Sequence, residues 1–432
     1  RQYFVLLQNN RDYRFLWIGS VVTQLGDWFN LLASAELITT LTNSGVAVSY
    51  LFLARFLPLF VFSPIAGVLA DRYSRRYIMV ATDVLRAGVV LCFLFVRSPE
   101  HIWLLYLLTA LQFALSALFT PARSALLANI VDQEDLVTAN ALDSLTWSTM
   151  LAMGAMLGGV ATAVFGADIA FMLDAATFIF SGWMVSRIAH SVVRGSVVGQ
   201  ESSTQGWLTF VAGFQYLLSV PFLLGVSLAK GMGSFVWGAI NVLEISFADT
   251  VFPFTTPFLQ HVLQIRSGGT VTLSIIYVIS GLGTGFGPLL MRKWLGDVAY
   301  RMVWGIGIGF FLLAVGILGL SAAPTLWLFS VATLVRTVGS GALWVFSAAL
   351  LQTLVPDHIR GRVFAFEFAL LTLTQSLSTF GAGFLQDSWG MTVQQATAVF
   401  GWLGVVMFAG WLLFLFVFSP QLRNLASLEH VA

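Results

Sequence analysis

Long apolar stretches separated by short polar or Gly/Pro-marked turns dominate the sequence. Many of these stretches run for about 20 residues or more, the length that a helix needs to cross the hydrocarbon core of a bilayer. Continuous apolar runs favour helices over barrel strands, which are shorter and alternate in polarity. The pattern predicts twelve membrane spans, at residues 15–41, 46–69, 77–97, 102–127, 143–165, 168–190, 218–247, 269–291, 302–321, 325–353, 366–386 and 393–418.

The composition agrees with this pattern. Hydrophobic residues make up 58% of the 432 residues and charged residues only 9%, whereas soluble domains carry about 25% charged residues. The net charge of +1 gives no reason to expect a nucleic-acid partner. Cys92 is the single cysteine, so the chain cannot form an intrachain disulfide and has no cysteine motif for a metal. We therefore expect an all-α membrane protein with no metal site and no cofactor.

A polar segment near the middle divides the chain. Residues Arg194–Gly206 are rich in Gly, Ser and Gln and form the longest polar break, so we interpret them as a linker. The predicted organisation is an N-terminal six-helix half at 1–193, a linker at 194–206 and a C-terminal six-helix half at 207–432.

Positive charges are distributed unevenly between the loops. If the N-terminus lies in the cytoplasm, fifteen Arg and Lys residues fall on the cytoplasmic side and only Arg97 and Arg266 on the other. Cytoplasmic loops of membrane proteins are enriched in Lys and Arg. We therefore expect a multi-pass protein of the cell membrane (inner or plasma membrane) with both termini and the linker in the cytoplasm.

The two halves contain similar segments at matching positions. Residues 124–131 resemble residues 348–355, which lie 224 positions later, and Gly67 and Arg72 match Gly287 and Arg292, 220 positions later. Two similar offsets indicate a duplication in which the halves are parallel repeats. Such repeats place a substrate site near the bilayer midplane.

The loop after the second span carries a motif of small, acidic and basic residues, Gly67-Val-Leu-Ala-Asp71-Arg72-Tyr-Ser-Arg75-Arg76. Its arginines alone are also typical of a basic loop that only sets membrane orientation. The motif resembles the signature loop of the major facilitator superfamily, with Ser in place of the usual Gly before Arg75. The resemblance implies twelve transmembrane helices in two pseudo-symmetric six-helix bundles and a transport function.

Further motifs extend the resemblance over nearly the whole chain. They are Pro121-Ala-Arg123-Ser-Ala-Leu-Leu, Phe171-Met-Leu-Asp174-Ala-Ala-Thr-Phe178 and Val355-Pro-Asp-His-Ile-Arg360-Gly-Arg362-Val363. They are similar to the efflux branch that contains macrolide exporters and the enterobactin exporter. In the fifth span, Gly154-Ala-Met-Leu-Gly158-Gly159 is similar to an antiporter motif with Ala in place of its proline. Small-residue helix packing is the other interpretation of these glycines.

Four spans carry polar or aromatic residues at steps of three or four, which places them on one helix face. These spans are, by resemblance, the helices that line the central cavity of a major facilitator. For most of the Ser and Thr on these faces, hydrogen bonding between helices is a sufficient interpretation. The predicted substrate and proton pathway consists of Gln24, Asp27, Asn30, Glu36, Arg55, Gln112, Lys230, Trp237, Asn241, Glu244, Arg336 and Trp344.

Charged residues near mid-span are the strongest functional candidates. A charge at the bilayer centre costs about 2.5–3.5 kcal/mol on insertion scales, so it needs a partner or a wet cavity. Asp27 and Arg55 fall at similar depths on adjacent spans, so they could form a structural ion pair, or Asp27 could be a proton-linked residue. Lys230 and Arg336 have no acid at the same depth in their own half, which predicts a cavity that is net positive at its midplane. A structural ion pair is the alternative interpretation for each of them.

A second set of charges is expected at the cytoplasmic end, where the resemblance implies a latch between the halves. Asp83 and Arg86 are one helical turn apart and can pair. Solvated interfacial charges are the alternative interpretation. The predicted conformational switch consists of Gly67, Asp71, Arg72, Arg75, Arg76, Asp83, Arg86, Arg360, Arg362 and Glu367.

The leading functional hypothesis is a monomeric secondary transporter that exports a small amphipathic molecule in exchange for protons. The chain has no Walker A loop, so ATP is not expected to drive it. Lipid flipping and solute uptake are alternatives within transport. A channel and a membrane-embedded enzyme are alternatives outside it, but all five histidines fall at span ends or in loops.

Overall fold

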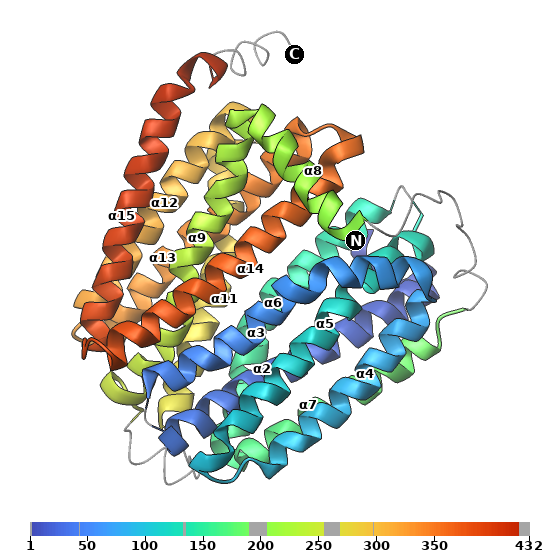
Figure 1. The fold of residues 1–432 in the computed structure, drawn as a ribbon, viewed down its shortest axis with the longest axis vertical. Helices are drawn as coiled ribbons and strands as arrows, with labels where there is room; N and C mark the ends of the chain where they lie inside the picture. The colour runs from blue at the N-terminus through green and yellow to red at the C-terminus, as the bar shows by residue number, and fades with distance from the viewer. Residues whose placement is uncertain are drawn as a thin grey trace. The chain divides into compact units, whose positions relative to one another are not determined.

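The computed structural model describes residues 2–42, 44–132, 135–189, 205–254, 268–296 and 298–422. The described part of the chain is helical (Figure 1). The shorter helices are α1 (Gln2–Asn9) and α8 (Gln205–Ser219), together with a π-helical turn at Phe247–Val251. The longer ones are α2 (Arg11–Thr42), α3 (Gly45–Arg72), α4 (Arg75–Cys92), α5 (Ile102–Ile130), α6 (Leu136–Phe165), α7 (Ala167–Ser186), α9 (Pro221–Ser246), α11 (Gly268–Leu295), α12 (Ala299–Ala322), α13 (Leu326–Leu354), α14 (Asp357–Asp387) and α15 (Val393–Val417).

Each predicted span falls on one of the long helices, so the all-helical fold is confirmed. Among the described residues, 11 helices are long and apolar enough to cross a membrane. Helix α2 is the long helix that does not qualify. Its 32 residues are ample for a crossing at about 1.5 Å per residue, but the polar residues of its predicted pathway face lower its apolar content.

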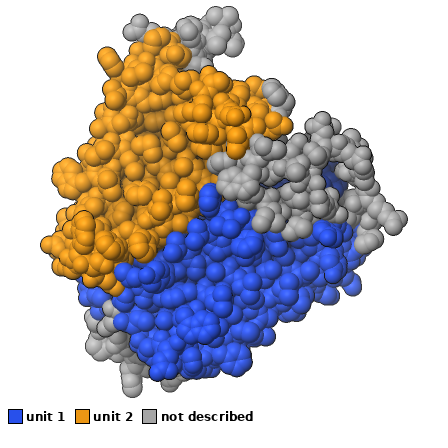
Figure 2. Space-filling view, viewed as in Figure 1, with its two compact units in different colours: residues 1–207, 248–278 blue, residues 208–247, 279–432 orange. Residues whose placement is uncertain are grey.

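The chain divides into two compact units (Figure 2). Unit 1 contains residues 1–207 and 248–278, and unit 2 contains residues 208–247 and 279–432. The segment 248–278, which includes the first turns of α11, therefore groups with the N-terminal helices. The predicted linker lies largely outside the described residues, so the division into halves at 193 and 207 stays a prediction.

Unit 1 is built from closely packed helix pairs. Helix α2 packs against α6 and α7, α3 against α5, and α4 against α5 and α7. A Cβ atom at Gly26 of α2 would lie 2.5 Å from Oδ1 of Asp174 on α7, so this close approach needs a residue without a side chain. The first turns of α11 also pack here, because Trp28 and Tyr277 meet edge to face with ring centroids 5.1 Å apart.

Unit 2 repeats part of this pattern. Helix α9 packs against α14, α12 against α13, and α12 against α15. These pairs occupy the repeat positions of α2 with α6, α4 with α5, and α4 with α7, as a duplicated chain predicts. Gly309 on α12 and Gly339 on α13 lie against each other's backbone, since a Cβ at either would lie 2.9 or 2.6 Å from the other's carbonyl oxygen.

Candidate functional site

Unit 1 encloses charged residues from three helices inside its bundle. Asp83 on α4 and Asp174 on α7 are fully buried, and Arg86 on α4 is 4% exposed. Asp27 on α2 is half-buried. The buried amide of Asn30, one helical turn after Asp27, lies next to Asp174. The charged residues therefore come together where α2, α4 and α7 meet.

The predicted pairing of Asp83 with Arg86 is confirmed, because Nη2 of Arg86 donates to Oδ1 of Asp83. Their position relative to the cytoplasm stays a prediction. Asp83 is the ninth residue of α4, about 12 Å into the helix at 1.5 Å per residue. The Arg86 guanidinium lies between two aromatic rings, 4.4 Å from the centroid of Phe119 and 4.5 Å from that of Phe178.

Arg55 is placed differently from the predicted ion pair. Among the described residues, Arg55 and Asp27 form no ion pair. The guanidinium instead lies 4.4 Å from the ring centroid of Phe113 on α5, a favourable cation–π geometry. The reason is the packing of α3 on α5. Arg55 nevertheless remains within electrostatic range of Asp27 and Asp174.

Unit 2 contains two buried ion pairs, which corrects the expectation that its cations lack acids. Nζ of Lys230 lies 3.1 Å from Oε2 of Glu367, and both side chains are at most 7% exposed. Arg336 donates to Glu244, and each of these side chains is 1% exposed. The prediction compared the depths of backbone positions, but a long basic side chain places its charge well away from its backbone position. The expected net positive midplane is therefore wrong for these two residues.

Glu367 forms the buried pair with Lys230, and its predicted role in the conformational switch stays a prediction. The Lys230 ammonium also lies 4.6 Å from the ring centroid of Trp344, whose side chain is 44% exposed. Lys230 is thus held between a carboxylate from α14 and an aromatic ring from α13. Asn241 is buried and Trp237 half-buried on the same helix, α9.

The remaining pathway residues lie on the predicted faces of unit 1. Gln112 on α5 is 1% exposed, and Gln24 on α2 is half-buried. The side-chain oxygens of both are buried without a hydrogen-bond partner in the described part of the chain. Glu36 accepts a hydrogen bond from the Thr270 hydroxyl at 3.4 Å. The side-chain oxygens of Gln24 and Gln112 are therefore suited to accept hydrogen bonds from water or from a ligand.

The basic residues of the signature loop contact helix ends. Nη1 of Arg75 donates to the carbonyl of Ala125 at 3.0 Å, near the end of α5. Arg76 donates to the carbonyl of Ser186, the last residue of α7. Cations near helix C-termini are stabilising, so these contacts join the ends of α4, α5 and α7.

The other switch residues are described only in part. Arg360 donates to the carbonyl of Val355, and Arg362 is exposed. The side chains of Gly67, Asp71 and Arg72 lie outside the described residues, so the latch stays a prediction.

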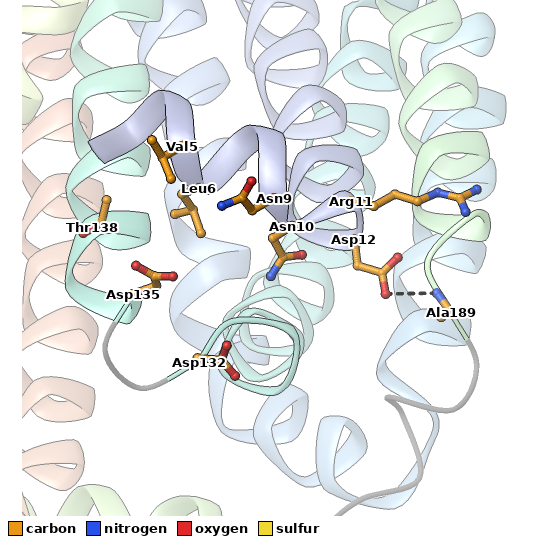
Figure 3. A pocket seen from close by; sticks show the side chains of 10 residues that line it. All are labelled: Val5, Leu6, Asn9, Asn10, Arg11, Asp12, Asp132, Asp135, Thr138 and Ala189. Atoms are coloured by element: carbon orange, nitrogen blue, oxygen red, sulfur yellow. Dashed lines mark hydrogen bonds between the residues drawn. The ribbon is translucent and has the colours of Figure 1, made fainter. Parts of the chain in front are cut away.

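A cavity of about 900 Å³ opens at the helix ends of unit 1 (Figure 3). It carries three carboxylates, and Asp12 accepts a hydrogen bond from the backbone of Ala189 at 3.4 Å. The cavity is separate from the buried charges described above, and no sequence motif points to it. Its lining consists of Val5, Leu6, Asn9, Asn10, Arg11, Asp12, Asp132, Asp135, Thr138 and Ala189.

Two carboxylates that lie close to arginines in the fold, Asp143 and Asp174, are not among the residues predicted from the sequence. Asp143 on α6 accepts from Arg123 on α5 at 2.8 Å, and Arg123 also donates to Ser20 on α2. Asp174 lies in one of the motifs that resemble the efflux branch but is not among the predicted pathway residues. The signal that could have identified it is an acid within a 20-residue apolar helix, which is a functional candidate by default.

Helices of membrane-spanning length, packed in repeated pairs around buried charges, define an integral membrane transporter of the major facilitator type. The profile of one family, the transmembrane secretion effectors of the major facilitator superfamily, matches residues 7–431, so the chain belongs to this family. The predicted resemblance to the superfamily is confirmed. Transporters of this class act on small molecules and are not enzymes.

Curated relatives and solved structures agree with this assignment. The chain is 26% identical over 396 residues to the uncharacterised MFS-type transporter YfiS of Bacillus subtilis, covering 90% of each chain. It is 23% identical to macrolide efflux protein A of Streptococcus pyogenes, covering 89% of this chain and 92% of the relative. The crystal structure of the nucleoside transporter NupG, in a D323A mutant, matches with a TM-score of 0.72 over 95% of this chain and 99% of that one. At 13% identity, this last likeness shows the fold alone.

Proposed function

We propose that the chain is a secondary active exporter that moves a small amphipathic molecule out of the cell in exchange for protons. The observation that carries the proposal is Asp27, a half-buried acid on the polar face of α2. It lies within electrostatic range of Arg55 and Arg86 but forms no ion pair among the described residues. Such an acid can gain or lose a proton as its access to water changes.

The efflux direction is supported by similarity. One relative is a macrolide efflux protein, and others are named as a bacilysin exporter and an enterobactin exporter. Their names span chemically different molecules. We therefore propose an amphipathic substrate and leave its scaffold open.

Alternating access is the proposed mechanism, in which one protonation site and one substrate site are exposed to each side in turn. A ligand shifts such an equilibrium only by its difference in affinity between the two states. We propose that Asp27 supplies this difference for the proton, with Glu36 and Glu244 as the next candidates. The signature-loop residues Asp71 and Arg72 are proposed to stabilise one of the two states.

The test is transport by purified protein in proteoliposomes. With inside-out orientation and an acidic lumen, a labelled macrolide should accumulate inside, and a protonophore should abolish the accumulation. Asp168→Asn is a suitable control, because it removes a solvent-exposed pair with Arg97. Movement of the macrolide down its own gradient, independent of the proton gradient, would contradict the proposal. Proton-driven movement of the macrolide out of the lumen would indicate uptake.

We also propose that the protein is a monomer in the cell membrane with both termini and the linker in the cytoplasm. The charge asymmetry of the loops supports this orientation. The native thiol Cys92 is half-buried, so it is replaced by Ser before single cysteines are introduced. A cysteine at position 200 should react with impermeant reagents only from the cytoplasmic side. Labelling from the outside alone would overturn the orientation.

A further inference from the structure

One group of charged residues inside unit 1 contains three acids and only two arginines. We call this group the acid–arginine cluster, and it consists of Asp27, Arg55, Asp83, Arg86 and Asp174. Asp27 lies within electrostatic range of both arginines and of both other acids. Asp174 likewise lies within range of both arginines. The five groups therefore form one electrostatic unit contributed by α2, α3, α4 and α7.

The partners of the cluster members are unequal. Asp83 has a direct ion pair with Arg86. Asp27 is half-buried and faces both arginines without a direct ion pair among the described residues. Asp174 is fully buried and forms no ion pair in the described part of the chain. Its Oδ1 accepts a weak hydrogen bond from Thr177 at 3.4 Å, and the Asn30 amide lies beside the carboxyl group. Its Oδ2 is buried with no hydrogen-bond partner in the described part of the chain.

The surroundings of Asp174 leave little room for water. Gly26 of α2 closes one side, because even a Cβ there would lie 2.5 Å from Oδ1. The charged groups that face Asp174 are Asp27 from α2, Arg55 from α3 and Arg86 from α4, and the Asn30 amide of α2 lies beside it. The acid on α6, Asp143, instead pairs with Arg123.

Charge balance decides the protonation of this cluster. With every group ionised, three carboxylates face two guanidinium groups and one negative charge is uncompensated. An uncompensated buried charge is strongly unfavourable, and a titratable group in that position becomes neutral instead. One added proton makes the cluster neutral.

We propose that the acid–arginine cluster is a proton-binding site, that it holds one proton, and that in the described conformation this proton lies on Asp174. Asp83 stays ionised because its partner is Arg86. We place Asp27 as the ionised partner because it faces both arginines. Asp27 and Asp174 then share one exchangeable proton, which deepens the proposed function and rests on it for the role in transport.

This arrangement makes a prediction about single and double substitutions. Replacing either Asp27 or Asp174 by Asn leaves two carboxylates against two arginines, so the charges balance without a proton. Replacing both leaves one arginine charge uncompensated. The double variant should therefore be much less stable than the sum of the single effects predicts, which is the signature of direct coupling.

The experiment compares wild type, Asp174→Asn, Asp27→Asn, Asp83→Asn and the double variant Asp27→Asn/Asp174→Asn, all purified in detergent. The first readout is the infrared band of a protonated carboxyl group at neutral pH. It should be present in wild type and absent in Asp174→Asn. The second readout is the melting temperature. Asp83→Asn is the comparison variant, because it changes the charge count in the same way as Asp174→Asn but also removes the direct ion pair with Arg86.

Asp174→Asn should melt within a few degrees of wild type, whereas Asp83→Asn and the double variant should lose about 5 °C or more. The proposal is overturned if wild type shows no protonated carboxyl band, or if the band survives in Asp174→Asn. It is also overturned if Asp174→Asn loses as much stability as Asp83→Asn. These readouts need no substrate, so a failure of proton-driven export would leave them intact and would refute only the proposed function.

Discussion

Lys230 of α9 and Glu367 of α14 form an ion pair of 3.1 Å in the interior of unit 2, with 7% and 3% of their side chains exposed. Both residues lie in helices of membrane-spanning length. The two charges therefore attract each other where water does not screen them. Removing either one would leave the other buried without a counter-ion.

We expect Glu367→Gln to destabilise the protein by about 3–5 kcal/mol, because it leaves the Lys230 ammonium buried without a counter-ion. The double variant Lys230→Met/Glu367→Gln should recover most of this loss. Thermal melting in detergent measures both effects. The control is Asp168→Asn, which breaks a pair with Arg97 whose side chains are 47% and 59% exposed and should cost less than about 1 kcal/mol. Equal losses for the buried and exposed pairs would contradict this prediction.

Gly339→Ala should destabilise unit 2 by about 1–3 kcal/mol, because overpacking forces the backbone apart. The new Cβ would lie 2.6 Å from the carbonyl oxygen of Gly309, and backbone cannot move aside as a flexible side chain can. Gly410→Ala on α15 is the matched control, since a Cβ there meets nothing within 4 Å. The control should be neutral or stabilising by up to about 1 kcal/mol, as Ala is the better helix former. Melting curves that coincide for the two variants would rule out close α12–α13 packing.

Asp27→Asn should abolish gradient-driven transport but preserve substrate binding and downhill exchange. The protein should remain folded, because Arg55 rests on the Phe113 ring and still faces Asp174. Transport with and without a proton gradient, together with binding in detergent, separates these effects. Normal gradient-driven transport would exclude the coupling role. A loss of expression that Arg55→Gln restores would show that Asp27 is a structural partner of Arg55.

Asp71→Asn should slow turnover with little effect on folding or on substrate affinity, because it is expected to weaken a contact present in only one transport state. The change shifts the equilibrium between states by the free energy that this contact contributes to one of them. Initial transport rates, compared at equal protein level with substrate binding, measure the effect. Wild-type turnover would indicate that the signature loop only sets orientation.

The number and position of the long helices and the superfamily could be predicted from the sequence, because they depend on the local composition of the chain. Apolar length defines the spans, and the basic loop after α3 identifies the superfamily. The short spacing of Asp83 and Arg86 sufficed to predict their pairing, since residues three apart on a helix are neighbours.

The partners of Lys230 and Arg336 could not be predicted in the same way. The prediction compared residues by their backbone positions along the spans, whereas the ion pairs with Glu367 and Glu244 depend on where the long basic side chains end. The surroundings of Asp174 could not be predicted from the sequence for a related reason. Its environment is created by Gly26 on α2 and by the arginines of α3 and α4, which are distant in sequence.

The polar face of α2 also has a consequence for how the protein is made. Most helices enter the bilayer from the translocation channel through their own hydrophobicity, and an acid at the helix centre opposes that step by about 2.5–3.5 kcal/mol. Helix α2 carries Asp27 and Glu36 and is the long helix that falls short of a membrane-spanning composition. Among the described long helices, α2 is thus the one least able to insert alone. Its insertion should depend on the strongly apolar α3, so that these two helices enter the bilayer as a pair.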